Sequence, residues 1–324
     1  MPKRSDDDFD WFRGAMGGMN LSPEQALNLE KQVDENPANK SARATLLGYY
    51  SSRPRKLGRA AREKQARHIL WVLEFAPACG LGVTPALSIS KADNPKEYDL
   101  AKQIILIQCK KYRRSAAVIS DLALALRDES ALSINLLRDA YAIAPKKMKY
   151  GIAFWLAALL HRQGLETANS QDLNDAVALM QEIFREKKTG LYACRLAQYA
   201  LNGNQYKLAR ETAEQMLQDY PDDNQCIHEA NIVLGLIALN AGEIATAKDR
   251  LLIAGRVGKS PRLVSYGPIM NLAQRFLELG ERSLVIQYLT DCKGFWEMGP
   301  ALLRKWINEI ESGAMPVMEG DRFS

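Results

Sequence analysis

The chain has 324 residues, of which 47% are apolar and 25% are charged, a mixture typical of proteins that bury a core. The formal net charge is +5, but residues 53–150 carry 19 basic and 9 acidic side chains, so the positive excess lies in the first half. The sequence has neither an apolar run long enough to cross a membrane nor the apolar region of a secretory signal, which predicts a cytoplasmic protein without a membrane partner.

The first 93 residues show an irregular helical pattern. Residues 1–20 are acidic and rich in glycine, and we expect a flexible N-terminal tail there. Residues 21–93 predict a divergent helical region that contains a basic linker, with Ser22 and Pro23 as the start of its first helix. Residues 78–95 form the longest irregular stretch and the expected subdomain boundary, and Val83–Ile89 is the one weak candidate for a strand.

From residue 94 to residue 312 the pattern is helix after helix. Glycine, asparagine and proline interrupt segments of about 11–16 residues, and residues 313–324 are expected to be a C-terminal tail. We therefore predict an all-α protein with about fifteen helices.

An internal repeat is the strongest signal in the sequence. Small residues of a first helix, turn residues, and residues of a second helix each recur every 38 positions. The three sets are Ala197, Gly235 and Ala273; Asn204, Gly242 and Gly280; and Ala209, Ala247 and Val285. This recurrence predicts antiparallel helix pairs at residues 190–219, 225–256 and 267–294.

This pattern resembles the tetratricopeptide repeat, most clearly over residues 190–294 and less clearly over 115–188. The resemblance implies a right-handed solenoid of antiparallel helix pairs over residues 94–312. The segment from Ser265-Tyr266-Gly267-Pro268 to Phe295-Trp296 is also similar to a group of uncharacterised bacterial repeat proteins, which implies no activity.

The same resemblance implies that the first helix of each pair lines a concave face. Residues three before, one after and five after the small residue lie on one helical stripe that would face a protein or peptide partner. These groove candidates are Cys194, Gln198, Asn202, Ile232, Leu236, Asn240, Met270, Gln274 and Glu278. An alternative interpretation is that their apolar members pack between neighbouring pairs.

Basic clusters in the first half offer a different interaction. If they share one face, they would attract the phosphates of a nucleic acid; otherwise they form a solvated surface that complements helix ends. The candidates are Arg53, Arg55, Lys56, Arg59, Arg62, Lys110, Lys111, Arg113 and Arg114. Lys146, Lys147 and Lys149 form a third basic cluster.

No motif in the sequence predicts catalysis, a metal or a cofactor. His228-Glu229 begins like a zinc-protease helix, but Ile232 stands where the second histidine ligand would be. The five scattered cysteines are expected to be reduced and mostly buried. The sequence thus favours a non-catalytic protein-binding scaffold, with a nucleic-acid-associated repeat protein as the alternative and an enzyme with an unrecognised site as the least favoured class.

Overall fold

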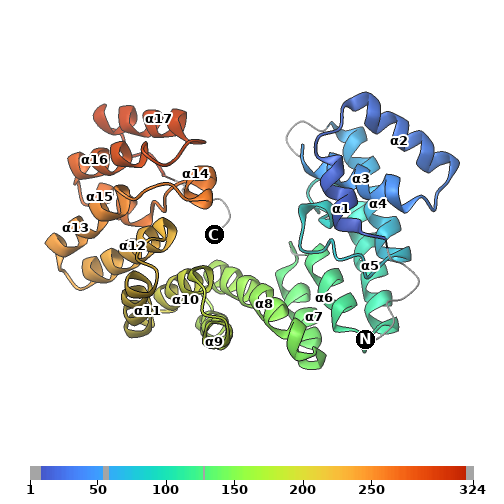
Figure 1. Ribbon diagram of the computed structural model, residues 1–324, viewed down its shortest axis with the longest axis horizontal. Helices are drawn as coiled ribbons and strands as arrows, with labels where there is room; N and C mark the ends of the chain where they lie inside the picture. Colours follow the sequence, from blue (N-terminus) through green and yellow to red (C-terminus); the bar gives the residue numbers. More distant parts are fainter. Residues whose placement is uncertain (1–8, 54–57, 127, 319–324) are drawn as a thin grey trace. The chain divides into compact units, whose positions relative to one another are not determined.

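A computed structural model describes residues 9–53, 58–126 and 128–318. Within these residues there are 17 α-helices, one short 3-10 helix and no β-strand (Figure 1). The all-α prediction is therefore confirmed, and Val83–Ile89 contains the 3-10 helix η1 (Pro85–Leu87) in place of a strand. None of the helices in this part of the chain combines the length and apolar character needed to cross a membrane.

The chain divides into two compact units, one ending at Gln163 and the other beginning at Gly164. The division falls inside α8 (Lys146–Thr167), whereas the sequence predicts a boundary at residues 78–95. That stretch has irregular backbone, but η1 packs against α3, so it belongs to the first unit.

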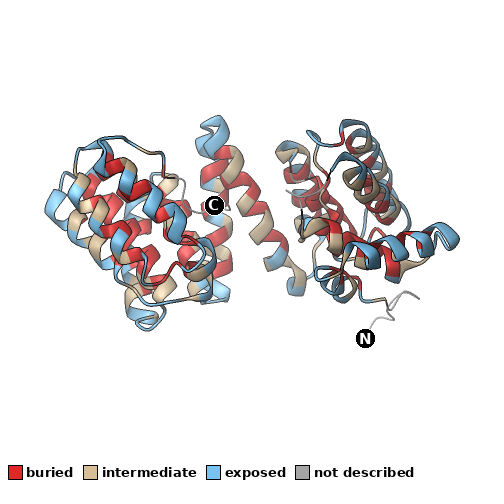
Figure 2. Ribbon diagram, turned by 90° about the horizontal axis from the view of Figure 1, so that it is seen from above, coloured by how far each residue is buried: buried red, intermediate tan, exposed pale blue. Residues whose placement is uncertain are grey.

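The helices of the first unit are mostly 8 to 17 residues long and bury one side against their neighbours (Figure 2). They are α1 (Trp11–Gly18), α2 (Pro23–Glu35), α3 (Lys40–Ser51), α4 (Arg59–Phe75), α5 (Pro95–Lys111), α6 (Ala116–Ala125), α7 (Ser130–Ile143) and the first part of α8.

The second unit contains the predicted pairs. Its helices are the end of α8, α9 (Ser170–Glu186), α10 (Gly190–Asn202), α11 (Tyr206–Asp219), α12 (Asn224–Asn240), α13 (Ile244–Gly255), α14 (Pro261–Tyr266), α15 (Asn271–Glu278), α16 (Arg282–Cys292) and α17 (Pro300–Glu311). The structure has 17 helices instead of the predicted fifteen or so for two reasons. The sequence does not predict α1, and it does not predict that α14 and α15 are separate helices, divided near Gly267, whose backbone is left-handed.

Neighbouring helices of the second unit pack in consecutive pairs, as in a helical solenoid. α10 packs on α11, α12 on α13, and α15 on α16. The first helices also contact one another along the series α10, α12 and α15, and α13 contacts α16. The buried apolar surface is thus continuous from one pair to the next.

The turns inside the three pairs repeat with the period seen in the sequence. The backbone is left-handed at Asn204 (φ 59°), Gly242 (φ 78°) and Gly280 (φ 81°). At each turn, the amide of the next residue donates back to a carbonyl five residues earlier, which satisfies the last turn of the first helix. These bonds are Gln205 N to Ala200 O (2.8 Å), Glu243 N to Ala238 O (2.9 Å) and Glu281 N to Phe276 O (3.0 Å).

Residues 11–18 are not the flexible tail that the sequence analysis expects. They form α1, which packs against α3 so closely that a Cβ on Gly18 would lie 1.8 Å from Thr45 O and a Cβ on Gly48 1.7 Å from Ala15 O. Trp11 is 5% exposed and lies beside Trp71. The glycines that suggest flexibility in the sequence allow the two helix backbones to touch. Residues 1–8 lie outside the described part.

We predict that Gly48→Ala displaces α1 from α3. A carbonyl oxygen of the backbone cannot move aside as a flexible side chain can, so the clash should destabilise the first unit by about 1–3 kcal/mol. Hydrogen–deuterium exchange should then show faster exchange of residues 11–18. Gly17→Ala is the control because a Cβ there meets no atom within 4 Å; unchanged protection of α1 in Gly48→Ala would contradict the prediction.

Candidate functional site

The predicted groove stripe of the second unit is largely filled. Its apolar members are buried, namely Cys194, Ile232, Leu236 and Met270. Gln198, Asn202 and Gln274 are partly exposed, and Asn240 and Glu278 are exposed. Cys194 Sγ lies 3.8 Å from Cys226 Sγ on the next first helix. The apolar half of the stripe is therefore buried, and Cys194 contacts the next first helix, as the alternative interpretation of the sequence expects.

A segment of the chain itself contacts the stripe at Gln274. The side-chain Oε1 of Gln274 accepts a hydrogen bond of 3.0 Å from the backbone amide of Met318, which is 5% exposed. Arg282 holds the start of this segment by donating to the carbonyls of Ile310, Gly313 and Ala314. The expected C-terminal tail is thus non-helical over residues 313–318 but lies against α15, and residues 319–324 are outside the described part.

The first basic cluster is mostly neutralised within the protein. Arg59 pairs with Glu63, Arg62 with Asp93, and Arg67 with Glu30 and Asp34. Arg53 donates to the carbonyls of Leu21 and Tyr49 and stacks on the Tyr49 ring. Arg55 and Lys56 lie outside the described residues. The described arginines of this cluster therefore offer little free positive charge to a polyanion.

The second basic cluster is different. Lys110, Lys111, Arg113 and Arg114 are exposed, and none of them forms an ion pair with another described residue. Lys110 and Lys111 lie in the last turn of α5, where they complement the helix dipole, and the Lys111 ammonium lies 5.1 Å from the centre of the Tyr112 ring.

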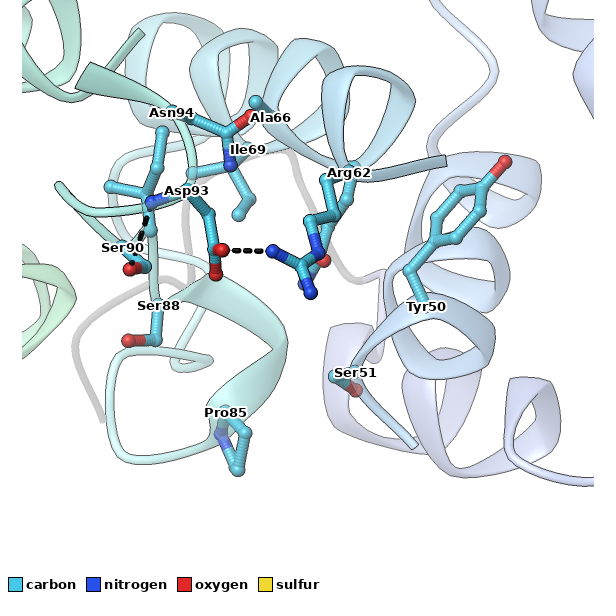
Figure 3. A pocket seen from close by; sticks show the side chains of 12 residues that line it. Tyr50, Ser51, Arg62, Ala66, Ile69, Pro85, Ser88, Ser90, Asp93 and Asn94 are labelled. Atoms are coloured by element: carbon cyan, nitrogen blue, oxygen red, sulfur yellow. Dashed lines mark hydrogen bonds and ion pairs between the residues drawn. The ribbon is translucent and has the colours of Figure 1, made fainter. Parts of the chain in front are cut away.

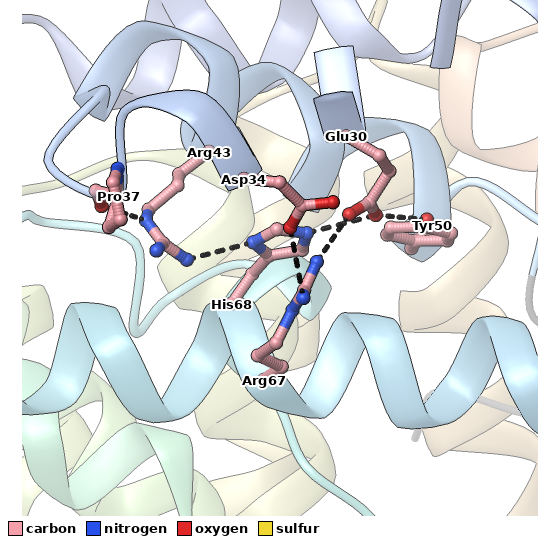
Figure 4. A network of polar contacts seen from close by, with 7 residues as sticks. All are labelled: Glu30, Asp34, Pro37, Arg43, Tyr50, Arg67 and His68. Carbon is pink, nitrogen blue, oxygen red and sulfur yellow. Dashed lines mark hydrogen bonds and ion pairs between the residues drawn. The ribbon is translucent and has the colours of Figure 1, made fainter. Parts of the chain in front are cut away.

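A buried polar network joins α2, α3 and α4 (Figure 4). Glu30, Arg43 and His68 are at most 5% exposed. Arg43 Nη1 donates to His68 Nδ1 (3.0 Å), and His68 Nε2 donates to Glu30 Oε1 (3.0 Å). Tyr50 donates to the same oxygen (2.5 Å), and Arg67 donates to Oε2 (2.6 Å).

The direction of these bonds fixes the charge of each group. A guanidinium can only donate, so Nδ1 of His68 must be the acceptor and the ring must be neutral with its proton on Nε2. Burial lowers the pKa of His68. Burial alone would raise the pKa of Glu30, but the bonds from His68 and Tyr50 and the nearby Arg67 lower it to about 2. With every partner engaged, the network holds three helices together and leaves no free acid or base.

Beside this network lies a cavity of about 210 Å³, lined by α3, α4 and the segment before α5 (Figure 3). Tyr50 and Ser51 line it from α3, and Ser88 and Ser90 from the loop. Its charged groups, Arg62 and Asp93, pair with each other. A charged ligand would have to break that ion pair, so the cavity is a poor candidate site.

A second, mainly apolar groove lies between α6 and α8 in the first unit. It has a volume of about 350 Å³, within the usual range of ligand pockets. The lining residues are Ala78, Gly80, Val83, Ala117, Ser120, Asp121, Leu124, Leu137, Lys147, Met148, Gly151, Ile152 and Trp155. A Cβ on Gly151 would meet no atom within 4 Å, so this glycine leaves the wall of α8 open.

Asp121 holds the loop that closes one side of this groove. Its carboxylate accepts the amides of Gly80 (2.8 Å) and Gly82 (2.5 Å), and the Cys79 thiol lies 3.4 Å from it. A Cβ on Gly82 would collide with Asp121. Burial raises the pKa of Asp121 despite these bonds. The irregular stretch expected as a boundary therefore forms part of the groove wall, which the repeat pattern could not indicate.

His228 in the second unit is a structural residue. It is fully buried; Nδ1 donates to Ala254 O (2.9 Å), and Nε2 accepts the amide of Ile269 (3.0 Å). It thus fixes α12 to the end of α13 and to the segment before α15. Among the described residues, no three His, Cys, Asp or Glu side chains converge to hold a metal ion.

We predict a pH-dependent stability from His228. Burial lowers its pKa to about 4 from 6.5, so the neutral form stabilises the fold above pH 6.5 and this stability is lost as the pH falls towards 4. The loss should reach about 2 kcal/mol at pH 5 and about 3 kcal/mol at pH 4. Urea unfolding across this range should show it.

His228→Gln keeps a donor and an acceptor but does not titrate. Other histidines also affect the profile of the wild type, so the prediction concerns the difference between the two proteins. Equal slopes of unfolding free energy against pH in both would contradict it.

Comparison with known proteins assigns no family to the chain. No protein-family model matches it, and no curated protein sequence matches it.

Proposed function

We propose that the chain is a non-catalytic protein-binding repeat protein, built from tetratricopeptide-like helix pairs, whose groove between α6 and α8 receives apolar side chains of a partner peptide. One observation carries this proposal. The groove has an apolar wall made by Leu124, Leu137, Ile152 and Trp155, with an unfilled space in front of Gly151.

The chemistry of the groove supports binding in preference to catalysis. Asp121 is the sole carboxylate among its lining residues, and both of its oxygens are bonded to the loop. Repeat proteins commonly hold peptides against successive first helices, and apolar side chains in pockets give such complexes their affinity. The proposal includes a cytoplasmic location, which suits five cysteines that are all free thiols.

A nucleic acid is the second candidate partner. The observation that favours it is the exposed set of Lys110, Lys111, Arg113 and Arg114, which have no ion-pair partner among the described residues. Binding through phosphates would weaken steeply with added salt.

We predict that Gly151→Leu blocks the groove without harming the fold. The new side chain points into open space, and replacing a helical glycine should stabilise α8 by about 0.5–1 kcal/mol. A random peptide library displayed on phage is selected against the full chain, and the enriched peptides are synthesised. Their affinity, measured by fluorescence anisotropy, should fall at least tenfold in Gly151→Leu.

Gly17→Leu is the matched control, since Gly17 is also an exposed helical glycine with no atom within 4 Å of an added Cβ. It should bind the same peptides as the wild type does. The proposed function fails if no peptide is enriched, or if Gly151→Leu binds the enriched peptides as tightly as Gly17→Leu.

A further inference from the structure

We infer that the groove between α6 and α8 selects an acidic amphipathic peptide, whose apolar side chains enter the groove while its carboxylates meet a basic rim at the N-terminal ends of both helices. This inference rests on the proposed function and adds the class of partner.

The two helices run in the same direction. α6 and α7 pack together, and a connection of four residues joins them, so they are antiparallel. Arg162, near the end of α8, donates to Ser130 at the start of α7 (2.8 Å), so α7 and α8 are also antiparallel. Hence α6 and α8 are parallel, and the positive ends of both helix dipoles lie at the same end of the groove.

Basic side chains gather at that end. Ala117 and Lys147 line the groove from the first turns of α6 and α8. Arg113 and Arg114 immediately precede the cap of α6, and Lys146 is the first residue of α8. All four basic residues are exposed, and none forms an ion pair with a described residue.

Acidic groups near the groove do not cancel this charge. The carboxylate of Asp121 is occupied by the amides of Gly80 and Gly82. Glu129, in the α6–α7 connection at the opposite end of α6, pairs with Lys102 (2.5 Å). Asp139, near the C-terminal end of α7 and so at the basic end, is one exposed carboxylate against four basic side chains. The free charge beside the apolar wall is therefore positive, and the complementary ligand joins apolar groups to several carboxylates.

The shape and lining of the groove favour a peptide over a nucleic acid. Its wall is mainly aliphatic, and Trp155 is its one aromatic side chain, whereas single-stranded nucleic acids usually stack on several aromatic rings. The described arginines between residues 53 and 67, which would otherwise extend a track for phosphates, are engaged in internal ion pairs and carbonyl contacts. Several cations at one rim also suit a peptide with several carboxylates better than a small monoacid.

The test uses the peptides enriched on the full chain. We expect them to combine apolar residues with an excess of Asp and Glu over the unselected library. Replacing the Asp and Glu of a synthetic peptide by Asn and Gln should weaken its binding at least tenfold. The double variant Lys146→Glu with Lys147→Glu should weaken the acidic peptide similarly, and negative charge at the start of α8 favours the helix, so the fold should persist.

The control is Arg304→Glu with Lys305→Glu, which reverses two adjacent exposed charges on α17 of the other unit; the exposed i,i+4 pair that Lys305 forms with Glu309 contributes little to stability. It should change the affinity less than twofold. An oligo(U) single strand is measured in parallel on all variants.

The outcomes separate the two proposals. In the first outcome, the enriched peptides bind and lose affinity in Gly151→Leu, so the proposed function stands. If these peptides nevertheless show no acidic excess, or do not respond to the lysine reversals, the inference of an acidic partner is overturned. Failure of the peptides to respond to Gly151→Leu overturns both. Oligo(U) binding tighter than any peptide and lost in the lysine variant would replace the peptide by a nucleic acid.

Discussion

Three successive helix pairs of the second unit reverse direction where the backbone must adopt a left-handed conformation. Glycine adopts it without strain, and asparagine tolerates it better than most residues, which explains why Asn204, Gly242 and Gly280 occupy these turns. The reversal turns each second helix back so that it packs beside the first. Small buried residues such as Ala209 and Ala247 then let the helices approach, and the pairs stack because each leaves an apolar side uncovered.

This constraint can be detected in a sequence because it fixes both residue type and spacing. The helix ends at Asn202, Asn240 and Glu278 repeat with the period that the turn residues predict. The position of α1 could not be predicted in the same way. Gly18 and Gly48 allow close contact between α1 and α3, which are separate in the sequence. In the sequence alone, a glycine needed for such a contact cannot be distinguished from a glycine in a flexible segment.

The two units stabilise their helices with different kinds of buried polar groups. In the first unit, Glu30 keeps its charge because several donors converge on it, and loss of one donor would leave a buried charge poorly compensated. In the second unit, His228 stays neutral and bonds only to backbone groups. The His228-Glu229 pair resembles the start of a zinc-protease helix in the sequence, but the contacts of His228 show that its role is structural.

The candidate site shows why a repeat register is a limited guide to function. The register indicates which residues of a first helix face away from its second helix, but Ile232 and Met270 are buried all the same. An open groove needs a departure from regular stacking. Between α6 and α8 that departure comes from a loop held by Asp121 and from a glycine at position 151, neither of which belongs to the repeat. Irregular elements inserted beside a regular array can therefore leave a groove open, and here Val83, from the irregular loop, is an exposed apolar residue of its wall.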